Sequence, residues 1–267
     1  MRHSPGQPPR RTSARNRTFL AATLGLLLAA PAAMAEAGHC APSASGDYVV
    51  HPIEHATFVL QSGECTLAFD PVGGGERFAA FPAPDFLLVT DVHGDHADAE
   101  TIAALADEGT TVIVPAAVAE TLGDAAPAGL RVLANGERLE VGAIGVEAIP
   151  MYNLTEGRLD RHPKGRGNGY VVTLAGRRLY VSGDTEDIPE MRTLEDIDAA
   201  FVCMNLPYTM TVEAAADAVL EMKPRVVYPY HYRGQGGLSD VERFAELVGA
   251  DPAIDVRRLD WYPGQGE

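Results

Sequence analysis

Basic residues are scarce in this 267-residue chain. It holds 21 Lys and Arg against 37 Asp and Glu, which gives a formal net charge of −16. Five of the basic residues fall within residues 1–35, which contain no acid, so the remainder has 16 basic residues and a net charge of −21. Such a chain lacks the overall basic footprint of a nucleic-acid-binding protein. We therefore expect no nucleic acid among its partners.

Two common catalytic frames are also missing. Ser182, in the segment VSGDT, has none of the Gly-x-Ser-x-Gly setting that exposes a nucleophilic serine. The glycine-rich segment PVGGGERF (71–78) lacks the Gly-Lys-Ser/Thr of a phosphate-binding loop. The chemistry has to come from other residues.

A long hydrophobic run occurs only near the N-terminus. Residues 1–17 are basic, residues 18–35 are apolar, and the run closes with Ala33-Met34-Ala35. This pattern predicts a secretory signal peptide cleaved after residue 35. The alternative is a membrane anchor, but the run is short for a span and Pro31 interrupts it. We expect a periplasmic or secreted protein without a stable membrane span after cleavage.

Cysteine is rare as well, with Cys40, Cys65 and Cys203 as the three residues of this type. In an oxidising compartment Cys40 and Cys65 could pair and tie the new N-terminus to the first strands. Three free cysteines are an equal alternative, because sequence alone does not fix a pairing. Cys203 lies in the apolar run AAFVCM and is expected to be a buried thiol.

Residues 36–267 contain no linker that would divide them, so we expect a single domain. Each half of this region begins with strand-like runs and continues with alternating strands and helices. The first expected helix covers residues 98–109, with Asp98 as its N-cap and Gly109 as its stop. Others are expected over 116–123, 188–197, 211–222 and 238–249. This order predicts an α/β protein, with two sheets packed face to face and helices outside, a four-layer αββα sandwich.

Acidic and histidine side chains follow several of the predicted strands. The segment LLVTDVHGDHADAE (87–100) contains Asp91, His93, Asp95 and His96 directly after an apolar run. Asp184 and His231 follow two other predicted strands, and His162 precedes one. Imidazole and carboxylate are ligands of zinc and similar ions. Loops at strand ends commonly carry chemistry, so this set favours a catalytic metal site over a closed structural one. In isolation, His162 could be a surface histidine, and Asp184 could cap a turn.

In this order, DVHGDH (91–96), His162, SGDTED (182–187) and YPYHY (228–232) resemble the metallo-β-lactamase fold superfamily. The segments HATFVL (55–60) and HPKGRGNGYVV (162–172) resemble more narrowly its ascorbate-6-phosphate lactonase-like and N-acyl phosphatidylethanolamine phospholipase D-like branch. The resemblance implies the αββα sandwich and a metal-dependent hydrolase with a small-molecule substrate.

The resemblance also implies two neighbouring divalent ions, zinc or else manganese or iron. The first would be held by Asp91, His93 and His162. The second would be held by Asp95, His96 and His231, and Asp184 would bridge the two.

Asp91 departs from the family pattern His-x-His-x-Asp-His. A carboxylate ligand favours manganese or iron more than an all-histidine site does. Alternatively, Asp91 does not bind the metal itself but orients a ligand histidine, His93 or His231. Asp70 is expected to support a ligand histidine, whereas His55 either faces the site as a rival to His162 or hydrogen-bonds the backbone.

The loop around His162 reverses the charge of the chain, with Arg158, Arg161, Lys164 and Arg166 within nine residues. We expect Arg161, Lys164, Arg166 and Tyr208 to bind an anionic substrate; the alternative is pairing with nearby acids such as Glu156 and Asp160.

Two divalent ions would lower the pKa of a shared water, and the hydroxide would attack a carbonyl or phosphorus atom. Asp95 and Asp184 would be the catalytic residues, orienting the hydroxide or relaying a proton. The sequence thus predicts an exported hydrolase of lactones or phosphodiesters. The alternatives are a catalytically silent metal- or ligand-binding protein and, less favoured, a true β-lactamase.

Overall fold

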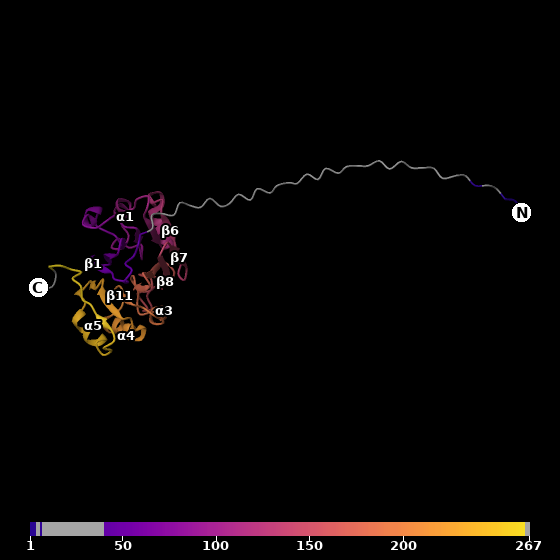
Figure 1. The fold of residues 1–267 in the computed structure, drawn as a ribbon. Coiled ribbons are helices and arrows are strands. Elements are labelled where there is room, and N and C mark those ends of the chain that lie inside the picture. The colour runs from indigo at the N-terminus through magenta and orange to yellow at the C-terminus, as the bar shows by residue number, and fades with distance from the viewer. Residues whose placement is uncertain (4–5, 7–39, 265–267) are drawn as a thin grey trace. The chain divides into compact units, whose positions relative to one another are not determined.

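The computed structural model describes residues 1–3, 6 and 40–264 (Figure 1). The chain divides into two units, Met1–Ala35 and Glu36–Glu267. Nearly all of the predicted signal peptide lies outside the described residues, and the described helices and strands belong to the second unit. None of the described helices is long and apolar enough to cross a membrane.

The first sheet has six strands that follow one another in chain order, with antiparallel pairing among the first three and parallel pairing from the third to the sixth. They are β1 (Val49–Glu54), β2 (Thr57–Ser62), β3 (Cys65–Phe69), β4 (Phe86–Leu88), β5 (Thr111–Val114) and β6 (Leu130–Val132). The strand-like run 48–61 is divided between β1 and β2 because the chain turns at His55, whose φ is 52°.

The second sheet has seven strands in the order β15-β12-β11-β10-β9-β8-β7. They are β7 (Arg138–Val141), β8 (Ile144–Met151), β9 (Gly167–Leu174), β10 (Arg177–Val181), β11 (Ala199–Cys203), β12 (Val226–Tyr230) and β15 (Asp255–Val256). Pairing is antiparallel from β7 to β10 and parallel from β10 to β15. A separate two-stranded ribbon joins β13 (Arg233–Gly234) to β14 (Gly237–Leu238).

The α-helices lie on the outside of the sheets; in Figure 1, α1 is at the upper side of the folded second unit and α4 and α5 are at its lower side. They are α1 (Ala99–Leu105), α2 (Ala116–Leu122), α3 (Pro189–Arg192), α4 (Val212–Met222) and α5 (Val241–Val248), beside the short 3₁₀ helices η1 (Gly75–Phe78) and η2 (Gly123–Ala125).

Three of the predicted helices are shorter than expected, among them α5, which begins at Val241 rather than at residue 238. α1 starts after its N-cap Asp98, as predicted, but it ends at Leu105 with Ala106 as its C-cap, because Asp107 and Thr110 close a separate turn that contains Gly109. The prediction of Gly109 as the stop was therefore wrong. α3 covers one turn of the predicted range 188–197, because the chain leaves the helix at Thr193.

Hydrophobic side chains fill two layers. Between the sheets Phe58 stacks on Phe69 and Phe201, with ring centroids 4.4 and 4.7 Å apart. Val59, the next residue of β2, belongs to a smaller core that includes Ile102 of α1. Successive side chains of a strand point to opposite faces, so β2 separates the two cores. The predicted α/β sandwich is confirmed.

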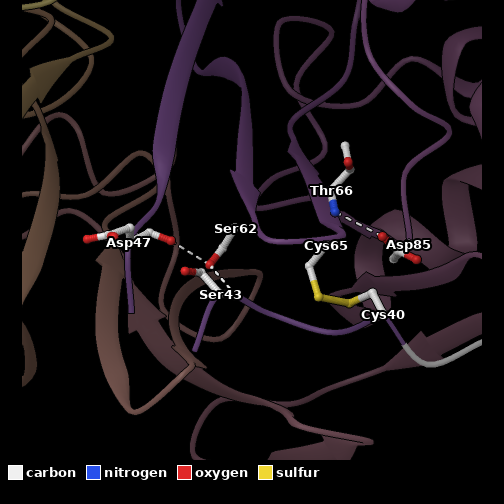
Figure 2. The surroundings of a disulfide bond; sticks show 7 residues. All are labelled: Cys40, Ser43, Asp47, Ser62, Cys65, Thr66 and Asp85. Atoms are coloured by element: carbon white, nitrogen blue, oxygen red, sulfur yellow. Dashed lines mark hydrogen bonds between the residues drawn. A yellow bond between two sulfur atoms is a disulfide. The ribbon is translucent and has the colours of Figure 1, made fainter. Parts of the chain in front are cut away.

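Cys40 and Cys65 form a disulfide, which was one of the two alternatives (Figure 2). The segment behind Cys40 is held further by Ser62, which accepts a hydrogen bond from the Ser43 amide (3.2 Å) and donates one to the Asp47 carbonyl (2.6 Å). The segment before β1 is thereby fastened to the start of β3. Cys203 is buried and free, as predicted.

Candidate metal centre

The seven predicted ligand residues meet at one edge of the two sheets. Asp91, His93, Asp95 and His96 follow β4, Asp184 follows β10, His231 follows β12, and His162 lies in the loop between β8 and β9. The carboxyl ends of parallel strands within a sheet share an edge, and loops there gather residues from distant parts of the chain.

Three non-glycine residues at this edge have left-handed backbone conformations. The φ angles are 52° for His55, 43° for Asp70 and 44° for His231. Such conformations carry a strain cost and persist where the surroundings over-determine them. Here the His231 amide donates to the His55 carbonyl at 3.2 Å. The backbone therefore turns both side chains toward the same point.

Glycine is required directly before Asp184. Gly183 has a φ of +60°, and a Cβ atom there would lie 2.4 Å from the Met151 sulfur. A larger residue would strain the backbone and displace the turn. Gly183 thus fixes where the Asp184 carboxylate emerges.

One ligand group consists of Asp95, His96 and His231, with ligand atoms within 4.8 Å of one another. The Nε2 atoms of His96 and His231 face each other at 3.3 Å. The Nε2 of His231 also lies 3.5 Å from Asp95 Oδ2. Two imidazole nitrogens and a carboxylate converging on one point are suited to holding a cation.

The outer nitrogen of His96, which is the Nδ1 atom pointing away from the centre, is hydrogen-bonded to a buried carboxylate. His96 Nδ1 lies 2.9 Å from the Oδ2 atom of the buried Asp70. Thr90 in turn donates to Asp70 through its amide and its hydroxyl, both at 2.7 Å. Because Nδ1 donates to the carboxylate, Nε2 is the ring nitrogen turned toward the centre, an arrangement typical of metal-binding histidines. Asp70 therefore lies where a supporting residue was predicted.

Asp184 lies in the middle of the cluster. Its Oδ2 is 3.3 Å from His162 Nε2 and 3.5 Å from His96 Nε2, and its Oδ1 is 3.3 Å from His231 Nε2. Burial raises the pKa of Asp184, but His231 and His96 outweigh it and hold this pKa well below its usual value. Oδ1 is buried and has no hydrogen-bond partner among the described residues. An anionic oxygen left unsatisfied among imidazole nitrogens fits a bound cation.

Asp91, His93 and His162 form a second group within 4.8 Å. Here a guanidinium intervenes. Arg166 donates to Asp91 Oδ1 through Nε at 3.1 Å and to Asp91 Oδ2 through Nη2 at 2.9 Å. Burial raises the pKa of Asp91, but its hydrogen bond with His93 and the charges of His96 and Arg166 leave this pKa below its usual value.

A cavity of about 490 Å³ opens onto the cluster. Besides metal-ligand candidates, it is lined by His55, Arg161, Asn205, Tyr208, Arg233 and Gln235. Of the predicted substrate residues, Arg161 and Tyr208 are thus at the cavity, and the Arg161 guanidinium lies 5.1 Å from the centre of the Tyr208 ring.

The structure does not bring Lys164 and Arg166 to the cavity lining. Lys164 pairs with Glu190 at 2.6 Å and donates to the Tyr152 hydroxyl at 3.2 Å. Arg166 turns inward to Asp91. The alternative prediction was that the basic residues of this loop pair with acids. Both residues do so, although their partners are Glu190 and Asp91 rather than Glu156 and Asp160.

His55 faces the site rather than only bonding backbone. Its Nδ1 lies 3.2 Å from His231 Nδ1 and 3.1 Å from the Tyr262 hydroxyl. Burial, with His231 and Arg233 nearby, lowers the pKa of His55 to about 4. The sequence reasoning missed Arg233 and Gln235; the position of Arg233 two residues after His231 was the available clue.

Comparison with known proteins agrees with this architecture. The beta-lactamase superfamily domain matches residues 50–231. A UPF0173 metal-dependent hydrolase from Thermococcus onnurineus is 31% identical over 205 residues, which cover 73% of this chain and 89% of that protein. One from Pyrococcus abyssi is 30% identical and covers 76% of this chain and 92% of that protein.

Solved structures show the same fold. A metal-dependent hydrolase from Parabacteroides distasonis is 37% identical, with a TM-score of 0.74, over 84% of this chain and 99% of that one. A metallo hydrolase from Ignicoccus hospitalis shares the fold at 21% identity and a TM-score of 0.67, over 83% of this chain and 97% of that one. The chain therefore belongs to the metallo-β-lactamase superfamily, among the UPF0173 metal-dependent hydrolases, and is a metal-dependent hydrolase.

Proposed function

We propose that the mature chain is an exported hydrolase that uses a divalent ion to cleave a small anionic ester of the lactone or phosphodiester type. The observation that carries this proposal is the buried Asp184 carboxylate. It lies among three imidazole nitrogens beside the cavity, and its Oδ1 has no hydrogen-bond partner among the described residues. The cavity is large enough for a small molecule.

Asp95, His96, Asp184 and His231 would hold the ion. A divalent ion supplies Lewis acidity there, polarising the bond to be cleaved and lowering the pKa of water. Burial raises the pKa of Asp95, but its hydrogen bond to His231 and the charge of His96 leave it well below its usual value. Asp95 is therefore an anion at neutral pH, and its half-exposed carboxylate can accept a hydrogen bond from the attacking water and orient it.

Anion binding is supported by the cations of the cavity wall. Arg161 and Arg233 both line the cavity in a chain that is otherwise strongly acidic, and Arg233 also pairs with Glu54 at 3.1 Å. The Nε of Arg161 is buried and makes no hydrogen bond to any described residue. A guanidinium with unused donors next to a metal centre is suited to a carboxylate or phosphate group of the substrate.

Export is supported by the N-terminal pattern and by the Cys40–Cys65 disulfide, because disulfides persist in oxidising compartments. Expression of the full chain in a Gram-negative host tests it. We expect the protein in the periplasmic fraction with Glu36 as its first residue. Cytoplasmic protein with Met1 intact would contradict export.

The hydrolase proposal is tested with residues 36–267 loaded with Zn²⁺, Mn²⁺ or Fe²⁺ and assayed on lactones, phosphodiesters and cephalosporins. We expect turnover of a lactone or a phosphodiester and none of cephalosporins. Asp184→Asn should lose both bound metal and turnover, because it removes the charge at the centre of the ligand group.

Asp187→Asn is the matched control, since Asp187 pairs with Arg192 outside the cavity. It should keep metal and activity. Metal binding without turnover on the whole panel would favour the silent binding protein instead, and failure to bind any of the three ions would refute the proposed centre.

A further inference from the structure

We propose that this chain holds one divalent ion rather than two, because the Arg166 guanidinium takes the place of the second cation within the Asp91–His93–His162 group. This inference rests on the proposed function, since it concerns the same centre. Four features of the structure carry it.

The first feature is the engagement of Asp91. This side chain is fully buried, and the planar fork of Arg166 binds both of its oxygens. Paired hydrogen bonds between guanidinium and carboxylate are charge-assisted and geometrically specific. Asp91 thus already has a cationic partner where the superfamily pattern has a histidine.

The second feature is the hydrogen bonding of His93. The Nη2 of Arg166 lies 3.3 Å from His93 Nε2, and a guanidinium nitrogen can only donate. In this contact His93 Nε2 can act only as the acceptor, which leaves Nδ1 as the donating nitrogen. That nitrogen lies 2.8 Å from Asp91 Oδ2 and donates to it. Both ring nitrogens of His93 are committed, and neither offers a lone pair to a metal ion.

His96 differs from His93 at its inner nitrogen. Its outer nitrogen donates to Asp70, just as the outer nitrogen of His93 donates to Asp91. Its inner nitrogen, however, faces the candidate ligands His231 and Asp184 rather than a guanidinium. One ligand group is therefore prepared to receive an ion, whereas the other is satisfied internally.

The third feature is the balance of charge. The charge of Arg166 cancels that of Asp91, while Asp95 and Asp184 leave two negative charges for a single divalent ion. An arginine side chain stays protonated in proteins. A second divalent ion in the Asp91 group would be repelled by this fixed charge at short range.

The fourth feature is the anchoring of Arg166. Its Nη2 also donates to the carbonyl of Arg161, in the same loop. Removing the guanidinium from the group would break this bond and leave the Asp91 carboxylate buried without a counter-charge, which is costly. Arg166 is therefore a fixed positioning residue of the centre rather than a mobile substrate ligand.

Metal stoichiometry tests the inference. Residues 36–267 are stripped of metal, equilibrated with Zn²⁺ or Co²⁺ and freed of unbound ion, and metal per chain is measured by mass spectrometry. We expect one ion for the wild type. Arg166→Gln frees Asp91 and His93 and should bind two, whereas Lys164→Gln, which removes a charge from the exposed part of the same loop, should bind one.

A paired variant provides an independent measurement. The double variant Asp91→His, Arg166→Gln has the histidine of the superfamily pattern at position 91 and no guanidinium beside it. It should bind two Co²⁺ ions. Their electron paramagnetic resonance should show a coupled pair, against an isolated ion in the wild type. Circular dichroism checks the fold of each variant, and the count for the wild type decides even if a variant fails to fold.

Two ions in the wild type would overturn the inference while leaving the hydrolase proposal intact. One ion in a folded Arg166→Gln protein would also overturn it. No ion in the wild type would refute both proposals, so the two failures are distinguishable.

Discussion

At the scale of single residues, the capacity of a histidine to bind a metal ion depends on what its inner ring nitrogen faces. The outer nitrogens of His96 and His93 both donate to a carboxylate, but the inner nitrogen of His93 lies against the Arg166 guanidinium. Both histidines belong to one six-residue motif and look equivalent in the sequence. The difference comes from a partner 73 residues after His93.

This explains how much of the site could be predicted. The seven candidate ligands were identified because each follows or precedes a recognisable strand, and the structure brings all seven together. The pairing of Asp91 with Arg166 spans 75 residues and depends on how two loops pack. Lys164 and Arg166 have the same charge and lie two residues apart, so composition alone gave both the same role.

The cysteines allow a chemical test of burial. Burial raises the pKa of the Cys203 thiol to about 11, and Cys203 is inaccessible to solvent. We expect no reaction of the native protein with Ellman's reagent at pH 8. One thiol per chain should react in denaturant without reductant, and three after reduction. Three thiols without reductant would mean that Cys40 and Cys65 are not paired.

The lowered pKa of His55 predicts that the stability of the protein depends on pH. Its pKa is lowered from 6.5 to about 4 in the folded protein, so between these values the unfolded chain binds more protons. The free energy of unfolding should therefore fall as pH falls from 6.5 toward 4. Urea denaturation of metal-free protein at pH 7 and pH 5 should show a smaller loss for His55→Gln than for the wild type. Equal losses would exclude this role.

At the scale of elements, local chemistry predicted the start of α1 better than its end. Asp98 was recognisable as an N-cap because capping depends on a side chain and the amides that directly follow it. The end of α1 was missed because the turn at Asp107 and Thr110 is held partly by a bond from Thr110 to the Pro84 carbonyl, 26 residues away. α3 was overestimated because the chain leaves the helix at Thr193, and Asp196 later takes a left-handed φ of 55°, neither of which the helical pattern revealed.

Asp98 should stabilise more than its own helix. Its carboxylate accepts hydrogen bonds from the Glu100 amide (3.0 Å), the Thr101 hydroxyl (2.7 Å) and the Gly73 amide (3.3 Å). We expect Asp98→Ala to lower the free energy of unfolding by about 1 kcal/mol, the usual cost of a lost cap. Urea denaturation measures it. Asp124→Ala, an exposed acid in η2, is the control and should change stability little; a similar loss in both variants would contradict the capping role.

At the scale of the whole molecule, the centre joins the two sheets. The loop after β4 belongs to the first sheet, whereas Asp184 and His231 follow strands of the second. The αββα architecture was predictable because the order of strands and helices repeats along the chain. The strand order of the second sheet was not, because it depends on pairings between distant segments.

The disulfide should contribute to global stability. Cys40 and Cys65 are separated by 25 residues, and closing a loop of that length in the unfolded chain corresponds to about 3 kcal/mol. Cys40→Ala with Cys65→Ala should lower the free energy of unfolding by that order in urea. Wild type with reductant should match the variant. Unchanged stability in both would show that the bond adds nothing.

The strand β3 is held to other parts of the structure at both of its ends, and this should slow its local opening. Cys65 starts it with the disulfide, and Asp70, directly after it, binds Thr90 and His96 below the centre. Between these two points every residue of β3 is buried. Local opening of this strand therefore requires both fastenings to yield, so its amide protons should exchange with solvent more slowly than those of β6, whose residues are partly exposed.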